Sequence, residues 1–197
     1  MDNLFRLKNK REEKLSESQK KIQEVFLASR ELREIGNEKD YQKYIESIFP
    51  ESKIKDVVYH GGTMNPEDRG KDSFTGEFGG KHGLYFTGSE SRAKSYTKAA
   101  TKEYENKSKI FPVRLNITKP LDSKIWSKWK YGLDRITDKE YEIIKEHGAD
   151  GLIEKDFLSH FTQYLTQYAV LEPAQIHVLG SEADIEKFKE FVAEKTT

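Results

Sequence analysis

The chain has 197 residues and a mass of 22.9 kDa, a size that suits one domain with a small appendage. Lys and Arg together number 34, as do Asp and Glu, and this zero net charge disfavours a nucleic-acid binder that works through bulk charge. The chain has no cysteine, which excludes disulfides, thiolate nucleophiles and cysteine-ligated zinc. Because the sequence also lacks a membrane-length apolar run and an apolar signal core, we expect a cytoplasmic protein with no membrane partner.

The first 50 residues predict a helical extension that precedes the main domain. Apolar residues recur at three- and four-residue steps over residues 9–35, which predicts a helix that Gly36 ends in a C′ role. A second helix is expected over residues 38–48, before Pro50. We interpret residues 1–50 as an amphipathic support for the main domain, and a docking helix for a partner is the alternative.

Residues 51–197 predict an α+β domain. Strands are expected over residues 56–60, 83–87, 109–117, 151–154, 167–171 and 175–179, and helices over a segment capped by Ser89 and over residues 137–147 and 181–193. The strands and helices do not alternate as βαβ units. The expected sheet is therefore largely antiparallel.

Glycine is concentrated in one part of the chain, where eight of the 13 glycines lie between Gly61 and Gly88. Such a cluster indicates unusual backbone dihedrals or a close approach to something. Neither standard glycine motif fits, because His82 follows Lys81 where a P-loop needs Ser or Thr, and no Gly-x-Gly-x-x-Gly run occurs. The histidines show no close pair at zinc spacing and no Gly-x-Ser-x-Gly elbow is present, so we expect no metal and no serine hydrolase of that type.

Three other segments share one family pattern. They are Val-Val-Tyr-His-Gly-Gly-Thr at 57–63, Gly-Leu-Tyr-Phe-Thr at 83–87 with a second tyrosine, Tyr96, eleven residues after Tyr85, and Gln-Tyr-Ala-Val-Leu-Glu-Pro-Ala-Gln-Ile at 167–176. Together they resemble the ADP-ribosyltransferase superfamily, which has His on the first strand, Tyr on a later strand and usually Glu on a strand near the end. The resemblance covers about residues 40–180. It is closest to the diphtheria-toxin and poly(ADP-ribose)-polymerase branch, and within it to the short transferases of phage and mobile-element polyvalent proteins.

The resemblance implies a fold and an activity. The fold would have two mainly antiparallel sheets, split around an NAD cleft. The activity would be mono-ADP-ribosyl transfer from NAD, as co-substrate, to a macromolecular acceptor, with release of nicotinamide and without a metal. The acceptor is expected to be a protein, with a nucleic acid as the alternative, and the compartment would be the host cytoplasm if the protein is phage-encoded.

The family's roles pass to matching positions of this sequence. His60 would hydrogen-bond a ribose hydroxyl, Gly61 would hold the carboxamide through its backbone, and Tyr85 and Tyr96 would enclose the nicotinamide ring, with Thr63 also near the cofactor. Gln167 falls at the position of the catalytic glutamate, and Gln175 matches a structural glutamine. The catalytic set is thus Gln167, His60 and Tyr85, and the NAD-binding set is His60, Gly61, Thr63, Tyr85 and Tyr96.

Residue chemistry independently supports parts of this assignment. A cationic ring gains from flat aromatic walls, and close backbone approach to a carboxamide favours glycine. A pyrophosphate needs cations or backbone N–H groups, for which Arg69, Lys71 and Lys81 are candidates. In the family, the segment before the catalytic position selects the acceptor, and here residues 155–166 carry Phe157, Phe161 and Tyr164, as recognition surface or as buried core.

The sequence departs from the family at Gln167, which is neutral. The glycosidic bond breaks through an oxocarbenium-like state that a carboxylate stabilises, and losing such a group costs on the order of 10²–10³ in rate. This departure favours single transfer over chain elongation, and leaves NAD hydrolysis and a degenerate NAD-binding or protein-interaction module as alternatives. Glu154 is a second carboxylate on the preceding strand, whereas Glu172 lies in the turn before Pro173 and is not expected at the site.

Overall fold

The computed structural model describes residues 15–63, 65–68, 82–99, 108–126, 128, 136–158 and 164–195. Its helices are α1 (Glu17–Ala28), α2 (Arg30–Ile35), α3 (Glu38–Ser47), α4 (Glu90–Ala99), α5 (Ser123–Trp126), α6 (Asp138–Glu146) and α7 (Glu182–Glu194). Its strands are β1 (Val58–Gly62), β2 (Leu84–Thr87), β3 (Lys109–Leu115), β4 (Gly151–Leu158), β5 (Tyr164–Val170) and β6 (Ile176–Val178).

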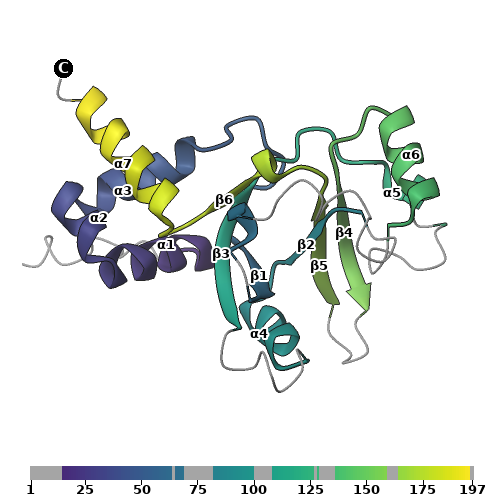
Figure 1. The fold of residues 1–197 in the computed structure, drawn as a ribbon, viewed down its shortest axis with the longest axis horizontal. Coiled ribbons are helices and arrows are strands. Elements are labelled where there is room, and N and C mark those ends of the chain that lie inside the picture. Colours follow the sequence, from purple (N-terminus) through teal and green to yellow (C-terminus); the bar gives the residue numbers. More distant parts are fainter. Residues whose placement is uncertain are drawn as a thin grey trace, which may run out of the picture.

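The six strands form one sheet in the order β4-β5-β2-β1-β3-β6, and every pairing between them is antiparallel (Figure 1). The expected α+β class with an antiparallel sheet is therefore confirmed. The expectation of two sheets is not met, because the described strands belong to a single sheet. That sheet is nevertheless weakly joined in the middle, since β1 and β2 share only the register pair Tyr59↔Thr87, whereas β1 and β3 share five.

Side chains that alternate along the strands build the core on both sheet faces. One face carries a cluster that includes Val58, Phe86, Val113 and Val170. On the other face, Leu152 and Ala169 pack with Trp126 and Ile144 from α5 and α6. Figure 1 shows these two short helices at one end of the sheet, while α1, α2, α3 and α7 gather at the opposite end. Between these two groups of helices, α4 packs against β1 in the middle of the sheet.

The N-terminal helices share a hydrophobic core with the C-terminal helix and with the start of β1. Leu32, Tyr41 and Ile45 pack with Val57 and Phe188 in this cluster. The hydroxyl of Tyr41 also donates a hydrogen bond of 2.6 Å to a carboxylate oxygen of Asp184 in α7, although the two residues are 143 positions apart. The extension is thereby built into the domain that it precedes.

The helix expected over residues 9–35 is divided at Ser29, and its residues 9–14 lie outside the described part of the chain. Ser29 has an extended backbone and its side chain accepts a hydrogen bond from the amide of Leu32, so it ends α1 and caps α2. Gly36 does end α2, but the expected left-handed C′ conformation is wrong, because its φ of −162° is extended. A Cβ there would lie 3.0 Å from the ring of Phe188, so tight packing against α7 explains this glycine.

The remaining elements follow local signals with small shifts in their ends. The backbone and hydroxyl of Thr137 both contact Glu140, so the capping box expected for α6 is present, and Ser89 accepts from the amide of Arg92 at the start of α4. β4 continues to Leu158, four residues beyond its expected end. The last expected strand begins instead as a 3₁₀ turn, Pro173–Gln175, before β6.

Candidate functional site

A cavity of about 270 Å³ opens where β1 and β2 separate. It is lined by five of the six residues that the family resemblance selects, together with three of their strand neighbours: His60, Gly61, Tyr85, Tyr96 and Gln167, with Tyr59, Phe86 and Thr87. These residues come from three strands and a helix, so only the folded chain brings them together. The sixth selected residue, Thr63, is exposed just after β1 and does not line the cavity.

Four of the residues around this site form one row across the sheet. Tyr59 pairs with Thr87, Thr87 pairs with Gln167, and Gln167 pairs with Glu154 on the edge strand β4. Directly opposed residues of antiparallel strands project from the same face, with their Cβ atoms roughly 4.5–5.5 Å apart. The row therefore places Gln167 between a threonine hydroxyl and a carboxylate.

His60 bridges the gap between the two separating strands. Its ring is buried, and its Nδ1 lies 2.9 Å from the backbone carbonyl oxygen of Tyr85. A carbonyl oxygen only accepts hydrogen bonds, so Nδ1 must carry the proton. In the neutral ring Nε2 is then the acceptor nitrogen. This hydrogen bond therefore fixes the tautomer of the ring. It also joins β1 to β2 at a point where the two backbones no longer pair.

Gly61 is required by the packing of α4. A Cβ built at this position would lie 2.2 Å from the backbone oxygen of Ala93, a separation that side chains do not reach. The sequence suggested that backbone comes close to something at this glycine, and in the structure the close neighbour is a helix carbonyl. This contact holds α4, and with it Tyr96, against the end of β1.

Tyr85 forms a fixed wall of the cavity. Its hydroxyl donates to the carbonyl of His82 at 3.1 Å and accepts from the amide of Ile136 at 3.0 Å. The ring also packs against the cluster beneath α5 and α6. Two backbone partners and a packed ring leave this side chain little freedom, which suits a preorganised binding surface.

Tyr96 stands on α4 with 43% of its surface exposed, so it forms the open side of the cavity. Arg92, one helical turn earlier, donates to its hydroxyl at 3.1 Å, and the guanidinium carbon lies 4.8 Å from the ring centroid. A cation thus stands at the mouth of the cavity. Sequence reasoning did not select Arg92, although its four-residue spacing from Tyr96 on a predicted helix was a usable signal.

Gln167 is 6% exposed and lines the cavity with a polar side chain. Its amide nitrogen and oxygen are not among the buried, unpartnered side-chain atoms of the described residues, and the side chain lines a cavity that is open to water. A ligand in the cavity could therefore exchange hydrogen bonds with this amide in place of water.

Gln175, in contrast, has a fully structural role, as the family pattern implies. Its side-chain oxygen accepts from the amides of Leu171 and Glu172, both at 2.9 Å. Its nitrogen donates to the carbonyl oxygens of Asn116 and Asp150. This one side chain ties together the chain segments that follow β3 and β5 and precede β4.

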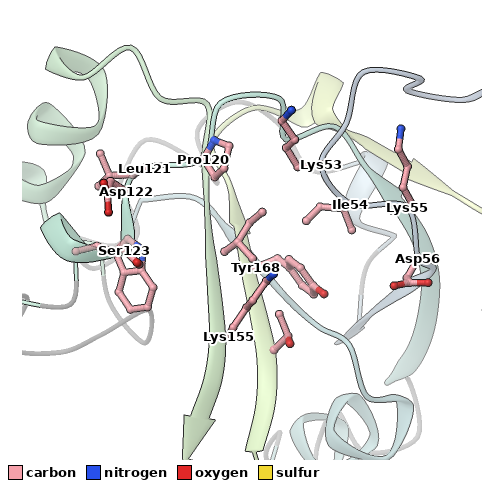
Figure 2. A pocket seen from close by; sticks show the side chains of 13 residues that line it. Lys53, Ile54, Lys55, Asp56, Pro120, Leu121, Asp122, Ser123, Lys155 and Tyr168 are labelled. Atoms are coloured by element: carbon pink, nitrogen blue, oxygen red, sulfur yellow. The ribbon is translucent and has the colours of Figure 1, made fainter.

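A larger cavity of about 780 Å³ lies on the opposite face of β5, where Tyr168 alternates with Gln167 (Figure 2). Figure 2 shows Lys53, Lys55 and Lys155 around it, from the segment before β1 and from β4. Burial, followed by the nearby Asp56, raises the pKa of the Tyr168 hydroxyl. This cavity is lined by none of the six selected residues.

Several residues that the sequence suggested fall outside the description. Arg69, Lys71 and Lys81, the candidates for a pyrophosphate contact, lie outside the described residues, as do Phe161 and the side chains of Phe157 and Tyr164. In the part of the chain that is described, no group of three or more His, Cys, Asp or Glu side chains could hold a metal ion. None of the described helices is long and apolar enough to cross a membrane.

No family model, no curated protein and no solved structure matches this chain. The geometry of the cavity is therefore the basis for a functional assignment. Its lining offers two tyrosine rings, an acceptor imidazole nitrogen and an amide, and a guanidinium contacts one of the two rings. Together these groups suit a polar ligand that contains a flat ring.

Proposed function

We propose that the protein is a mono-ADP-ribosyltransferase, which transfers one ADP-ribose from NAD to a macromolecular acceptor and releases nicotinamide. The observation that supports this most strongly is that five residues chosen by family resemblance line one cavity. They are separated by up to 107 positions in the sequence, from His60 to Gln167. These residues meet where β1 and β2 share only one register pair. A cleft between two parts of a sheet is the kind of NAD site that the resembled family has.

The nicotinamide ring would lie between Tyr85 and Tyr96, whose faces attract a cationic aromatic ring. A volume of about 270 Å³ is just below the roughly 300–1,000 Å³ of pockets that enclose drug-sized ligands. The cavity therefore suits the nicotinamide end of NAD, and the pyrophosphate would leave past Tyr96. At that exit, Arg92 offers a guanidinium suited to phosphate oxygens.

The ribose would lie between His60 and Gln167. With Nδ1 protonated, the Nε2 of His60 accepts a hydrogen bond from a ribose hydroxyl, and the buried amide of Gln167 meets a second hydroxyl. Both contacts fix the sugar relative to the ring that leaves. Orientation of this kind contributes to rate by keeping the reacting atoms aligned.

The reaction breaks the bond between the anomeric carbon and the nicotinamide nitrogen. Its electron pair stays with nicotinamide, which departs as a neutral ring, and positive charge develops on the ribose as an oxocarbenium-like state. A nucleophilic oxygen or nitrogen of the acceptor then bonds to the anomeric carbon and gives its proton to water. The neutral Gln167 favours transfer of a single ADP-ribose over chain elongation.

The proposal is tested with NAD labelled in its adenosine part, incubated with the full-length protein and a cell lysate. Transfer predicts label on a macromolecule together with an equal amount of free nicotinamide. His60→Ala should abolish both, while His147→Ala, which changes an exposed histidine at the C-cap of α6, should leave both intact. Free ADP-ribose without labelled acceptor would instead identify an NAD hydrolase, and NAD binding without nicotinamide release would identify a degenerate binding module.

A further inference from the structure

The edge strand β4 places a carboxylate directly beside the neutral residue at the catalytic position. Glu154 is the register partner of Gln167 in the antiparallel β4–β5 pair. Side chains in such a pair share one face of the sheet, with Cβ atoms roughly 4.5–5.5 Å apart. Leu152, two residues before Glu154, pairs with Ala169 and packs beneath α5 and α6, which confirms that this face is the one that carries Gln167.

The surroundings of Glu154 favour an electrostatic role. The residue is half-buried, and its Oε2 atom is shielded from solvent. A carboxylate in such a position is screened less by water and ions than one on an open surface, so its field extends further over the neighbouring side chains. On the same row, Gln167 and Thr87 are uncharged, so Glu154 is the row's only carboxylate.

The strand also changes its geometry just after this residue. Regular pairing runs from Gly151 to Glu154, and the register then shifts before Phe157 pairs with Leu165. An irregularity of this kind bends the strand and redirects the side chain beside it, and such irregularities are common next to active sites. Here it falls between Glu154, the register partner of Gln167, and Phe157.

We propose that Glu154 supplies the negative charge that Gln167 lacks, and so stabilises the oxocarbenium-like state of the ribose. This inference rests on the proposed transferase function. Glu154 forms no bond and moves no proton in this step, since its charge alone opposes the positive charge that develops on the sugar. In the resembled family that charge comes from the strand corresponding to β5, whereas here it comes from the neighbouring strand.

The pair also explains why a neutral residue is suitable at position 167. Two carboxylates directly opposite each other on one sheet face repel and destabilise the pair. With Glu154 in place, glutamine keeps the hydrogen-bonding amide and avoids that repulsion. The register pair of residues 154 and 167 would then carry one negative charge. That charge could lie on either β4 or β5.

This exchange defines the test, which compares four full-length proteins: wild type, Glu154→Gln, Gln167→Glu and the double variant Glu154→Gln/Gln167→Glu. For each, nicotinamide release and NAD affinity are measured, with a melting curve to check folding. We expect Glu154→Gln to lower the release rate on the order of 10²-fold, with NAD affinity changed by less than about threefold. The double variant should regain at least about tenfold over Glu154→Gln, because a carboxylate is again present in the same register pair, now on β5.

Glu146→Gln is the matched control, since it makes the same change at an exposed position on α6 and should leave the release rate at the wild-type value. The inference is overturned if Glu154→Gln releases nicotinamide as fast as wild type, or if the double variant is no faster than Glu154→Gln. Failure of the proposed function looks different, because the wild-type protein itself would then release no nicotinamide. A slow Glu154→Gln variant whose rate is restored in the double variant supports the inference, since a merely structural defect would not be repaired by a charge on another strand.

Discussion

The Nδ1 atom of His60 lies 2.9 Å from the carbonyl oxygen of Tyr85, across the gap where β1 and β2 separate. Beyond the register pair Tyr59↔Thr87 these strands no longer pair, so a side chain takes the place of a backbone contact. The same hydrogen bond joins the two halves of the sheet and fixes the orientation of the imidazole that lines the cavity. Structure and site are therefore coupled at this one residue.

The first prediction concerns the tautomer of His60. Because Nδ1 donates to a carbonyl, the neutral ring should carry its proton on Nδ1 and leave Nε2 unprotonated. Nitrogen-15 NMR of the ring at alkaline pH distinguishes the two tautomers directly. Observation of the Nε2–H tautomer would contradict both the hydrogen bond and the proposed contact to a ribose hydroxyl.

The second prediction concerns Gly61. An alanine Cβ would lie 2.2 Å from the backbone oxygen of Ala93, so Gly61→Ala must displace α4 and Tyr96 with it. We expect a loss of about 1–3 kcal/mol in the free energy of unfolding, as is typical of overpacking. Urea denaturation measures it, and NAD affinity should fall in parallel. Gly88→Ala is the control, since its Cβ would meet nothing closer than 3.8 Å.

The third prediction concerns stability at alkaline pH. Burial, followed by the charge of Asp184, raises the pKa of the Tyr41 hydroxyl, and the same causes raise the pKa of Tyr44. In the unfolded chain these tyrosines ionise near a pKa of about 10. Above that pH the unfolded state releases protons that the folded state retains, so the free energy of unfolding should fall as pH rises.

Tyr41→Phe tests this directly, because it removes one of the two raised groups. The variant should be less stable at neutral pH, since Asp184 loses a hydrogen bond of 2.6 Å, a loss that typically costs about 1–3 kcal/mol. Its stability should nevertheless decline less steeply between pH 9 and 11. Urea midpoints across that range measure the slope, and an unchanged slope would show that Tyr41 does not titrate differently on folding.

How much of the fold and of the candidate site the sequence could predict depends on how far apart in the chain the interacting residues lie. The caps at Ser89 and Thr137 could be predicted, since each depends only on positions three residues apart. The division of the first helix at Ser29 was missed, because the serine can cap a new helix as readily as it continues an old one.

Long-range relationships were not accessible in the same way. The sequence could name Glu154 as a carboxylate on a preceding strand, but only the register of β4 against β5 shows that it faces Gln167. A one-residue slip would have moved it to the opposite face of the sheet. The sequence also could not show why residue 61 must be glycine, since the residue that contacts it, Ala93, lies 32 positions away on α4.

The last prediction concerns Arg92, whose guanidinium stands over Tyr96 at the mouth of the cavity. If the pyrophosphate of NAD leaves past Tyr96, then Arg92→Gln should weaken the ground-state contact to phosphate and leave the bond-breaking step unchanged. We expect the KM for NAD to rise about five- to tenfold with kcat nearly constant, which is the signature of lost uniform binding. The effect should diminish at higher ionic strength, because screening weakens the wild-type contact.

Lys94→Gln provides the matched control for this change. Lys94 is exposed on the same helix, two residues from Arg92, and its substitution removes the same charge from the surface. An equal rise of KM in both variants would point to the general charge of α4 and not to a contact at the cavity mouth. A rise confined to Arg92→Gln would place the phosphates of NAD beside Tyr96, because only the guanidinium that contacts this ring would then matter.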